Sequence, residues 1–301
     1  MNDIISDVTK RHDFVLLFDV TDGNPNGDPD AGNLPRVDPE TMQGLVTDVC
    51  IKRKVRNFVD IMESGKEKMR IYVQNKGKAL NDLHQEAYEA KGLKSTGTKQ
   101  KREEVTTVRS WMCEQFYDIR MFGAVMTTEK NCGQVRGPVQ LTFARSIDPI
   151  IPLDISITRV AVTKPQDLEV VEGEKEGGGK VTEMGRKALL PYGLHKAYGF
   201  FTPTFAEDTK AAQADLKIFW AALQNMWDLD HSASRGMMAC RGIYIFSHDD
   251  KFGKAPAHSL LERVKAMRKE GVEAPRSFGN YSVQVNEVNM PQGVTLTRLA
   301  V

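Results

Sequence analysis

Two stretches of the chain carry hydrophobic patterns strong enough to predict one element each. The run FVLLFDV at residues 14–20 is β-branched and aromatic, which predicts a buried strand over His12–Thr21. Between Asp208 and Asp228, apolar residues recur at helical spacing, which predicts a helix capped by Asp208 or Thr209. The apolar stripe of this helix is typical of a core-facing surface and consists of Ala212, Leu216, Phe219, Trp220, Leu223, Met226 and Trp227.

Weaker periodicities predict the remaining elements. A helix capped by Thr41 or Asp38 is expected over 42–62, with an apolar stripe of Leu45, Val49, Val55, Phe58, Val59 and Met62. Further helices are expected over 76–89, 101–117 and 257–269. Strands are expected over 120–126, 135–143, 155–162 and 241–247, and a closing hairpin joins 282–288 to 294–299. This mixed order, without an internal repeat, indicates an α+β fold with a helical insertion near 63–117.

The overall composition is that of an ordinary globular protein. A chain of 301 residues, 41% hydrophobic and 27% charged, is long enough for one large domain or two smaller ones. It shows neither a signal-peptide pattern at its start nor an uncharged apolar run of membrane-spanning length, so we expect a cytoplasmic protein without a membrane partner. We also expect no cofactor, and reduced thiols instead of a zinc site at the scattered Cys50, Cys113, Cys132 and Cys240.

The net charge of +1 hides an uneven distribution along the chain. Residues 1–48 contain ten acidic and three basic side chains, whereas residues 51–102 contain fourteen basic and six acidic ones. A concentrated block of positive charge is typical of a surface for a polyanion. A solvated helical face explains the block equally well, so charge alone leaves both interpretations open.

The loop TDGNPNGDPD at residues 21–30 resembles the start of a calcium-binding EF-hand loop. Its twelfth position is Asn33 instead of a bidentate Glu, and a strand precedes it where an EF-hand needs a helix, so calcium is disfavoured. The carboxylates of Asp22, Asp28 and Asp30 could instead hold Mg²⁺ for phosphodiester cleavage. The interleaved Pro and Asn residues favour a rigid turn, so we expect no metal here.

The segment CIKRKVRN at residues 50–57 concentrates four cations on one predicted helix, namely Lys52, Arg53, Lys54 and Arg56. Lys52 and Arg56 would share a helical face, and like charges held so close favour an anion between them. Additional donors, if the fold brings them near, are Arg36, Arg136 and Gln140. Because no ladder of aromatic residues is evident, the pattern favours single-stranded nucleic acid held by its backbone over sequence-specific base reading.

Enzyme signatures are mostly absent from the sequence. It contains no H-E-x-x-H, no G-x-S-x-G and no G-x-G-x-x-G after a strand. His195 and His231 have no nucleophile at a telling spacing, so structural roles are favoured for both. The segment EGEKEGGGK at residues 172–180 matches a phosphate-binding loop only loosely, because Val181 replaces the required Ser or Thr. Its glycines favour a flexible hairpin tip or a protruding arm.

Six blocks of the sequence occur in an order that resembles one protein family. They are FDVTDGNPNGDPD, TDVCIKRKVRN, DIRMFGAV, RGPVQLTFARS, MGRKALLPYGLHKAYGFF and HSASRGMMACRGIYIF, within residues 12–247. Together they resemble the backbone subunit of type I-C CRISPR Cascade (Csd-two type), the seventh Cas family of the RAMP superfamily. No single block is specific by itself, but the ordered set is.

The resemblance implies a hand-like protein with a ferredoxin-like, RRM-related palm, a helical fingers insertion and a β-hairpin thumb. By position, the palm would comprise residues 1–62, 118–162 and 189–301, the last including C-terminal elements, with the fingers at 63–117 and the thumb at 163–188. Copies would stack head to tail along the guide RNA, which each thumb kinks at a regular interval. The side chains implied at the RNA are Asn24, Asn26, Arg36, Gln43, Lys52, Arg53, Lys54, Arg56, Arg136, Gln140, Met184, Arg186, Ser234 and Arg235.

The implied function is that of a non-catalytic subunit that grips the crRNA and presents it for pairing with target DNA. Implied partners are further copies of the chain, the capping, large and small Cascade subunits, and a helicase-nuclease recruited to the complex. The main alternative is a metal-dependent endoribonuclease acting through Asp28 and Asp30, as in related backbone subunits of other CRISPR types. An unrelated small-molecule or metal-binding enzyme is a third alternative. The thumb segment is longer and more acidic than the family needs, and its Glu172, Glu174 and Glu176 are expected to face the next copy's basic fingers.

Overall fold

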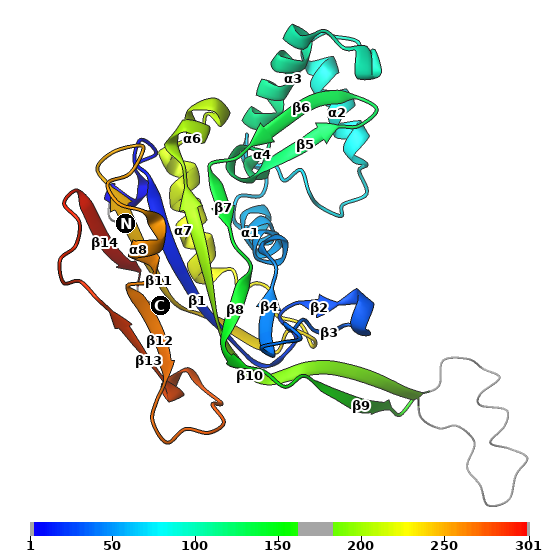
Figure 1. The fold of residues 1–301 in the computed structure, drawn as a ribbon. Coiled ribbons are helices and arrows are strands. Elements are labelled where there is room, and N and C mark those ends of the chain that lie inside the picture. Colours follow the sequence, from blue (N-terminus) through cyan, green and yellow to red (C-terminus); the bar gives the residue numbers. More distant parts are fainter. Residues whose placement is uncertain (1–2, 162–182, 300–301) are drawn as a thin grey trace, which may run out of the picture.

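An eight-stranded sheet lies at the centre of the computed structural model, which describes residues 3–161 and 183–299 (Figure 1). The sheet runs in the order β14–β11–β1–β10–β8–β4, with β7 and β9 also paired to β10, and every pairing is antiparallel. The strands are β1 (His12–Gly23), β4 (Gln43–Val46), β7 (Val139–Leu141), β8 (Ala144–Pro149), β9 (Leu153–Arg159), β10 (Glu183–Phe201), β11 (Met237–His248) and β14 (Val294–Leu299).

Helices and three small antiparallel strand pairs surround this sheet (Figure 1). The pairs are β2 (Gly27–Asp28) with β3 (Leu34–Pro35), β5 (Gly123–Thr127) with β6 (Asn131–Arg136), and β12 (Val264–Arg268) with β13 (Tyr281–Val285). The helices are α1 (Asp48–Met62), α2 (Leu80–Ala90), α3 (Arg102–Gln115), α4 (Tyr117–Phe122), α6 (Pro203–Thr209), α7 (Gln213–Asn225) and α8 (Ala257–Leu261). The chain is therefore a mixed α/β protein, as its sequence predicts.

Both faces of β1 are buried, which explains its uninterrupted apolar run. Phe14, Leu16 and Phe18 belong to the large hydrophobic cluster that α1 and α7 complete. Val15 and Leu17 belong to a different cluster, to which α8, β12 and β13 contribute. Because successive side chains of a strand alternate between the two faces, a strand covered on both sides is apolar throughout. The strand predicted from this run is confirmed.

The helix predicted over 208–228 is interrupted by Lys210, whose backbone is left-handed (φ 59°). The chain forms α6 before this residue and α7 after it, so a helix cap at Asp208 or Thr209 is wrong. Asp215 caps α7 instead, since its carboxylate accepts the N–H of Ala212 at 2.8 Å. Ala212 itself is exposed. The rest of the predicted stripe is confirmed as core, because the buried residues include Leu216, Phe219, Trp220, Leu223, Met226 and Trp227.

The helix predicted over 42–62 begins later, at Asp48. The reason is that Gln43–Val46 forms β4 and pairs with β8. The side chain of Thr47 caps α1 by accepting the N–H of Cys50 at 3.2 Å, so the two caps predicted upstream are wrong. Val49 and Met62 are 64% and 55% exposed, and neither belongs to the buried stripe of α1.

Several other elements predicted from hydrophobic periodicity are divided or paired differently in the structure. The strand expected over 120–126 begins only at β5, since α4 occupies the residues before it. The strand expected over 135–143 is divided into β6 and β7, and the helix expected over 257–269 ends with α8 and continues as β12. The closing hairpin does not form, because β13 pairs with β12 and β14 pairs with β11.

A second hydrophobic cluster lies apart from the sheet, at the top of Figure 1. It is built from α2, α3, α4, β5 and β6 and the segment that precedes α2. Its largest buried side chains are Tyr72, Tyr88, Met112 and Phe116. No helix in the described ranges is long and apolar enough to cross a bilayer. All four cysteines are free.

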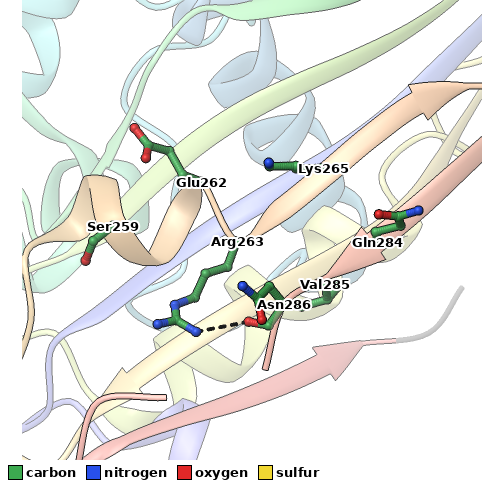
Figure 2. Close-up of a pocket in the computed structure, with 7 residues that line it drawn as sticks. All are labelled: Ser259, Glu262, Arg263, Lys265, Gln284, Val285 and Asn286. Carbon is green, nitrogen blue, oxygen red and sulfur yellow. Dashed lines mark hydrogen bonds between the residues drawn. The ribbon is translucent and has the colours of Figure 1, made fainter. Parts of the chain in front are cut away.

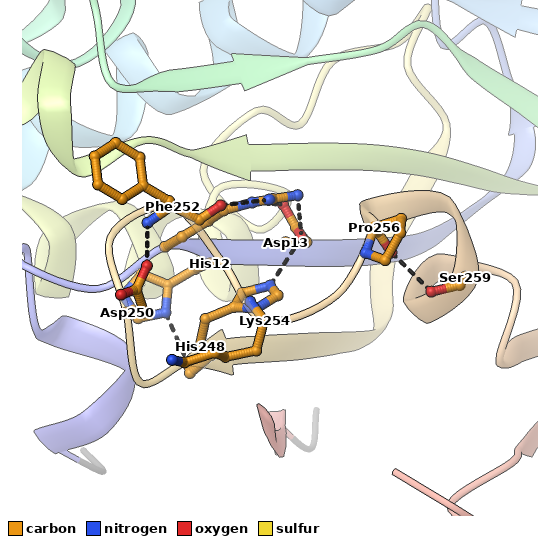
Figure 3. Close-up of polar contacts among 10 residues, drawn as sticks. His12, Asp13, His248, Asp250, Phe252, Lys254, Pro256 and Ser259 are labelled. Carbon is orange, nitrogen blue, oxygen red and sulfur yellow. Dashed lines mark hydrogen bonds and ion pairs between the residues drawn. The ribbon is translucent and has the colours of Figure 1, made fainter. Parts of the chain in front are cut away.

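A buried polar network joins the start of β1 to the end of β11 (Figure 3). One ring nitrogen of His12 (Nε2) faces the carbonyl of Asp7 at 2.9 Å and therefore carries the proton, so the Ser247 hydroxyl donates to the other nitrogen at 2.9 Å. His248 donates to the carboxylate of Asp13 at 3.0 Å, and its second nitrogen accepts a backbone N–H at 2.8 Å. These contacts fix each imidazole in one orientation within the sheet.

The unfolding free energy is expected to fall as the pH drops from about 7 to about 4. Burial lowers the pKa of His12 and of His195 to about 4 in the folded protein, against an ordinary value of 6.5. Below pH 6.5 the unfolded chain takes up two protons that the folded chain does not, and each costs roughly 3 kcal/mol of stability by about pH 4. Urea unfolding at stepped pH measures this slope.

Two variants separate this effect from general acid sensitivity. His195→Gln should reduce the pH slope by about one proton, whereas the exposed His258 should tolerate the same change without effect. An unfolding free energy that stays constant between about pH 6.5 and pH 5 contradicts the assignment.

Candidate nucleic-acid interface

The loop that follows β1 is held in shape by its two asparagines. The side-chain oxygen of Asn26 accepts both the N–H and the hydroxyl of Thr47 at 2.9 Å, which ties the loop to the start of α1. Asn24 is 4% exposed, and its side chain donates to the carbonyl of Asn33 at 2.7 Å. The N–H of Asn24 donates to the carbonyl of Ser234 at 2.7 Å. The loop is therefore a rigid turn, and its two asparagine side chains bind the protein itself.

Two glycines let this loop approach the segment before β11. A Cβ on Gly23 would lie 1.9 Å from the carbonyl oxygen of Arg235, which no real side chain tolerates. Gly236 has a left-handed backbone (φ 61°), and a Cβ there would lie 2.4 Å from the carbonyl oxygens of Thr21 and Asp22. Only glycine fits at either position, so the two backbones can pass in contact.

Lys54 is buried between α1 and the segment before β11. Its side chain is 2% exposed, forms an ion pair with Asp230 and lies 5.7 Å from the ring centroid of Trp227. Arg235 completes the group, since its guanidinium lies 3.5 Å from Asp230 and donates to the carbonyl of Pro25 at 3.0 Å. The helix places this ammonium in the interior, where Asp230 is its partner, so the geometry does not favour the predicted phosphate contact.

Arg56 is also buried, and it contacts α4 beside the second cluster. Its Nε donates to the carboxylate of Asp118 at 2.7 Å, and the two side chains are 9% and 1% exposed. Asp118 also accepts the backbone N–H groups of Tyr72 and Val73, at 2.8 and 3.1 Å. Arg56 is therefore bound within the protein, and the geometry does not favour the phosphate contact predicted for it.

Lys52 shares a helical face with Arg56, as the spacing predicts, and that face packs against the aromatic ring of Phe122. Both cations lie over Phe122, at 5.8 and 5.4 Å from its centroid. Lys52 also pairs with Asp48 at 2.8 Å, and its side chain is 12% exposed. Lys52 is therefore held mainly by contacts within the protein.

Three arginines keep their guanidinium groups accessible. Arg53 is exposed on α1, where it donates to the carbonyl of Val73 at 2.9 Å. Arg136 is exposed on β6 and stacks over Phe205, 4.4 Å from the ring centroid. Arg36 is partly exposed and lies 3.3 Å from Asp28. Each guanidinium keeps donor groups free for an anion, because one partner does not use all five N–H groups.

The predicted amide donors are occupied by the backbone. The side chain of Gln43 donates to the carbonyl of Ser146 at 2.9 Å, and that of Gln140 donates to the carbonyl of Gly137 at 3.0 Å. Ser234 is exposed, and its hydroxyl lies 3.2 Å from that of Ser232. The two amides are therefore engaged within the protein, whereas the accessible charge comes from the arginines.

β9 and the first part of β10 extend away from the sheet as a two-stranded arm (Figure 1). Every side chain of β9 is exposed. Leu153, Ile155 and Ile157 are every second residue of β9 and therefore lie on one face of the arm. Their exposed fractions are 38%, 41% and 50%. A row of exposed aliphatic side chains on a projecting element is typical of a surface that another molecule covers.

The arm also carries two predicted RNA contacts. Met184 is 75% exposed. Arg186 has a side chain that is 80% exposed and lies 3.1 Å from Asp154. Residues 162–182, which contain most of the predicted thumb and the acidic Glu172, Glu174 and Glu176, lie outside the described residues.

The acidic loop offers little to a metal ion. Asp28 pairs with Arg36, and its carboxylate also accepts the N–H of Asp30 at 3.2 Å. Within residues 3–161 and 183–299, no group of three or more His, Cys, Asp or Glu side chains could hold a metal. No observation in these ranges favours the endoribonuclease alternative.

A surface hollow of about 750 Å³ lies beside α8, β12 and β13 (Figure 2). Figure 2 shows that Glu262, Arg263 and Lys265 point in different directions. Arg263 donates to the carbonyls of Asn286 and Val288 at 3.1 and 2.9 Å, so it stabilises the turn after β13. This hollow does not gather its charged groups onto one ligand.

A protein-family model matches most of this chain. The family model described as CRISPR-associated protein Cas7 matches residues 10–286. The chain belongs to the Cas7 family.

A curated relative carries the same description. CRISPR-associated protein Cas7 of Haloferax volcanii is 26% identical over 244 residues, which are 71% of this chain and 64% of the relative. The chain thus spans less than two thirds of that Cas7 protein. One similar solved chain belongs to a "CRISPR RNA-guided surveillance complex, pre-nicking", with a TM-score of 0.48, 16% identity and coverage of 78% of this chain and 75% of that one. Another, from a "CRISPR RNA-guided surveillance complex", has a TM-score of 0.43, 14% identity and coverage of 78% and 68%. Scores this low support no conclusion about function.

Sequence reasoning missed the acidic residues that organise this Cas7 chain. Asp118 and Asp230 hold Arg56 and Lys54, from 62 and 176 residues away. Neither acid stands out in the sequence, because each is a single carboxylate whose partner lies in a distant element. Arg145 on β8 was also missed; it is exposed and pairs with Asp38 at 2.7 Å.

Proposed function

We propose that this chain is the backbone subunit of a type I-C Cascade, whose copies stack head to tail along a guide crRNA. The observation that carries the proposal is the Cas7 family match across residues 10–286. The six ordered sequence blocks support the type I-C assignment. The subunit grips the crRNA, each thumb kinks it periodically, and target DNA pairs with the exposed bases. The chain acts as a scaffold and not as an enzyme.

The strand order supports a ferredoxin-like palm. A ferredoxin-like unit has the sequence βαββαβ and the spatial strand order 4-1-3-2. Here β1, α1, β8, β10, α7 and β11 follow one another in that sequence, and the strands lie in the order β11–β1–β10–β8. The second cluster is inserted between α1 and β8, and the arm lies between β8 and β10.

The proposed segments are those that the family resemblance implies. The palm takes residues 1–62, 118–162 and 189–301, the fingers take 63–117, and the thumb takes 163–188. We revise this division at one point: β5 and β6 are assigned to the fingers instead of the palm, because Met126, Cys132 and Val135 pack into the second cluster. The described residues 183–188 of the thumb pair with β9 in the arm.

The proposed grip relies on accessible arginines set around a rigid loop. Arg53 on α1, Arg136 on β6 and Arg186 on the arm come from three separate elements, and Arg36 and Arg235 flank the loop. Guanidinium groups bind phosphates through paired N–H donors, so a phosphate chain can pass from one element to the next. Lys54 and Arg56 act indirectly, because their buried ion pairs position α1. Partners of the assembled complex are the capping, large and small subunits and a recruited helicase-nuclease.

The grip predicts a change in the salt dependence of RNA binding. In single-stranded RNA, each lost phosphate contact should lower the slope of log K against log salt by about 0.7. The triple variant Arg53→Ala, Arg136→Ala and Arg186→Ala should therefore bind more weakly, with a slope reduced by about 2. Titrations of labelled RNA at several salt concentrations, with and without Mg²⁺, measure the slope and the integrity of the RNA.

A charge-matched control removes three other exposed cations, Lys265, Lys269 and Arg276, from the β12–β13 region. This control should keep the wild-type slope. If the slope of log K against log salt is the same in both triple variants, Arg53, Arg136 and Arg186 do not contact the RNA phosphates. RNA fragments that appear only with Mg²⁺ favour the nuclease alternative.

A further inference from the structure

A cleft of about 540 Å³ lies where the second cluster meets the break between α6 and α7. One wall comes from α3, through Ser110, Trp111 and Glu114. The opposite wall comes from Thr209 and Lys210 and from the start of α7. Its volume is within the range of small-ligand sites. None of its residues belongs to the group expected at the crRNA.

The cleft carries an excess of positive charge. Two of its cations are neutralised by ion pairs: Lys68 lies 2.8 Å from Glu114, and Arg120 lies 2.7 Å from Asp215. Lys91 and Lys210 also line the cleft, are exposed, and form no ion pair with any residue of the described ranges. The ammonium group of Lys68, which pairs with Glu114, lowers the pKa of that carboxyl, and the charges of Lys91 and Lys210 lower it further. Two positive charges are left for an anion.

A buried hydroxyl without a partner lies in the same wall. Thr209 is 1% exposed, and in the described part of the chain its Oγ1 has no hydrogen-bond partner. The next residue, Lys210, takes a left-handed backbone (φ 59°), and α7 begins directly beyond it. Because Asp215 already caps this helix start, the donors left for a phosphate are the Thr209 hydroxyl and the ammonium groups of Lys91 and Lys210.

Trp111 supplies an apolar surface beside these donors. It is partly exposed and lines the cleft together with Met69. Indole faces stack on nucleobases, and such contacts are worth about 1–3 kcal/mol per base. We propose that this cleft binds a nucleoside phosphate, with the phosphate near Lys91 and Lys210 and the base against Trp111. The proposal rests on the two lysines without an ion pair in the described residues, on the unpartnered hydroxyl and on the indole. The same chemistry is present in a free nucleotide and in the 5′-phosphorylated end of a strand.

Trp111 also provides the readout. The chain has three tryptophans, and Trp220 and Trp227 are buried in the core at 0% and 2% exposure. Adding AMP to the full chain should therefore change the emission of Trp111, and the change should disappear in Trp111→Phe. Adenosine without phosphate should bind at least about tenfold more weakly, because a charged hydrogen bond is lost. A 5′-phosphorylated dinucleotide that binds more tightly than AMP identifies a strand end as the ligand; the reverse order identifies a free nucleotide.

Variants test each part of the cleft. The double variant Lys91→Gln and Lys210→Gln should weaken AMP binding about tenfold or more, and Thr209→Val should weaken it without unfolding the protein. The matched control, Lys94→Gln with Lys99→Gln, removes two exposed lysines that do not line the cleft. The proposal is overturned if millimolar AMP leaves the emission unchanged, or if adenosine binds as tightly as AMP. Binding of long RNA without a 5′-phosphate should be the same in all these variants, so failure here leaves the crRNA proposal intact.

Discussion

Replacing Arg56 by alanine is expected to lower the unfolding free energy by about 3–5 kcal/mol. The change leaves Asp118 charged and 1% exposed, with only two backbone N–H groups as partners. Removing one member of a buried ion pair is costly because the remaining charge has lost both water and its partner. The same change also removes the guanidinium that lies 5.4 Å from the ring centroid of Phe122. The loss should loosen the second cluster from α1.

Arg53 provides the matched control for this prediction, three positions earlier on the same helix. It is exposed, so Arg53→Ala should change stability by no more than about 0.5 kcal/mol while weakening RNA binding. Urea unfolding of both variants measures the first effect, and RNA titration below the unfolding transition measures the second. If Arg56→Ala is as stable as the wild type and binds RNA less well, Arg56 belongs to the grip and the assignment made here is wrong.

The predictions from sequence succeeded where one pattern determined one element. The uninterrupted apolar run of β1 and the helical stripe of α7 are both confirmed as core. In each case the burial of many large side chains dominates the local energetics, so neighbouring elements cannot change the outcome. Turn residues, by contrast, moved the boundaries of other elements, as at Lys210 between α6 and α7.

The longest strand, β10, was not predicted at all. Its sequence contains Pro191 and the glycines 185, 193 and 199, which normally indicate turns. In the fold, Gly199 lies opposite Phe14 of β1, and a Cβ there would lie 2.0 Å from the Phe14 ring. The glycine is therefore a packing requirement set by a residue far away in the chain, which sequence spacing cannot reveal.

The predicted cation cluster was right in composition and partly wrong in direction. Arg53 is exposed, whereas Lys54 and Arg56 are buried and pair with the carboxylates of Asp230 and Asp118. Helical spacing states which residues share a face but not what covers that face. The partners, Asp230 and Asp118, are supplied by segments that only the tertiary fold brings to α1.

Assembly on RNA is the second large effect that we expect. The aliphatic face of the arm, formed by Leu153, Ile155 and Ile157, is exposed in a single chain. If a neighbouring copy covers this face, Ile155→Asp with Ile157→Asp should prevent stacking while leaving one copy able to bind RNA. A head-to-tail contact that does not close into a ring generates a filament, and the RNA then sets its length. The matched control places Asp at two exposed positions on the opposite face of the arm, Ser156 and Thr158.

The most direct test of the account is to count the copies bound to single-stranded RNA as its length increases. The purified chain would be mixed with RNAs of graded length in the presence of Mg²⁺, and the mass of each intact complex would be measured. The RNA would be recovered afterwards to check whether it has been cut. The account predicts that bound mass rises in equal steps with RNA length, on intact RNA, and that the steps disappear in the double Asp variant of the arm. One bound copy at every length, or RNA that is cut, would contradict a stacking guide scaffold.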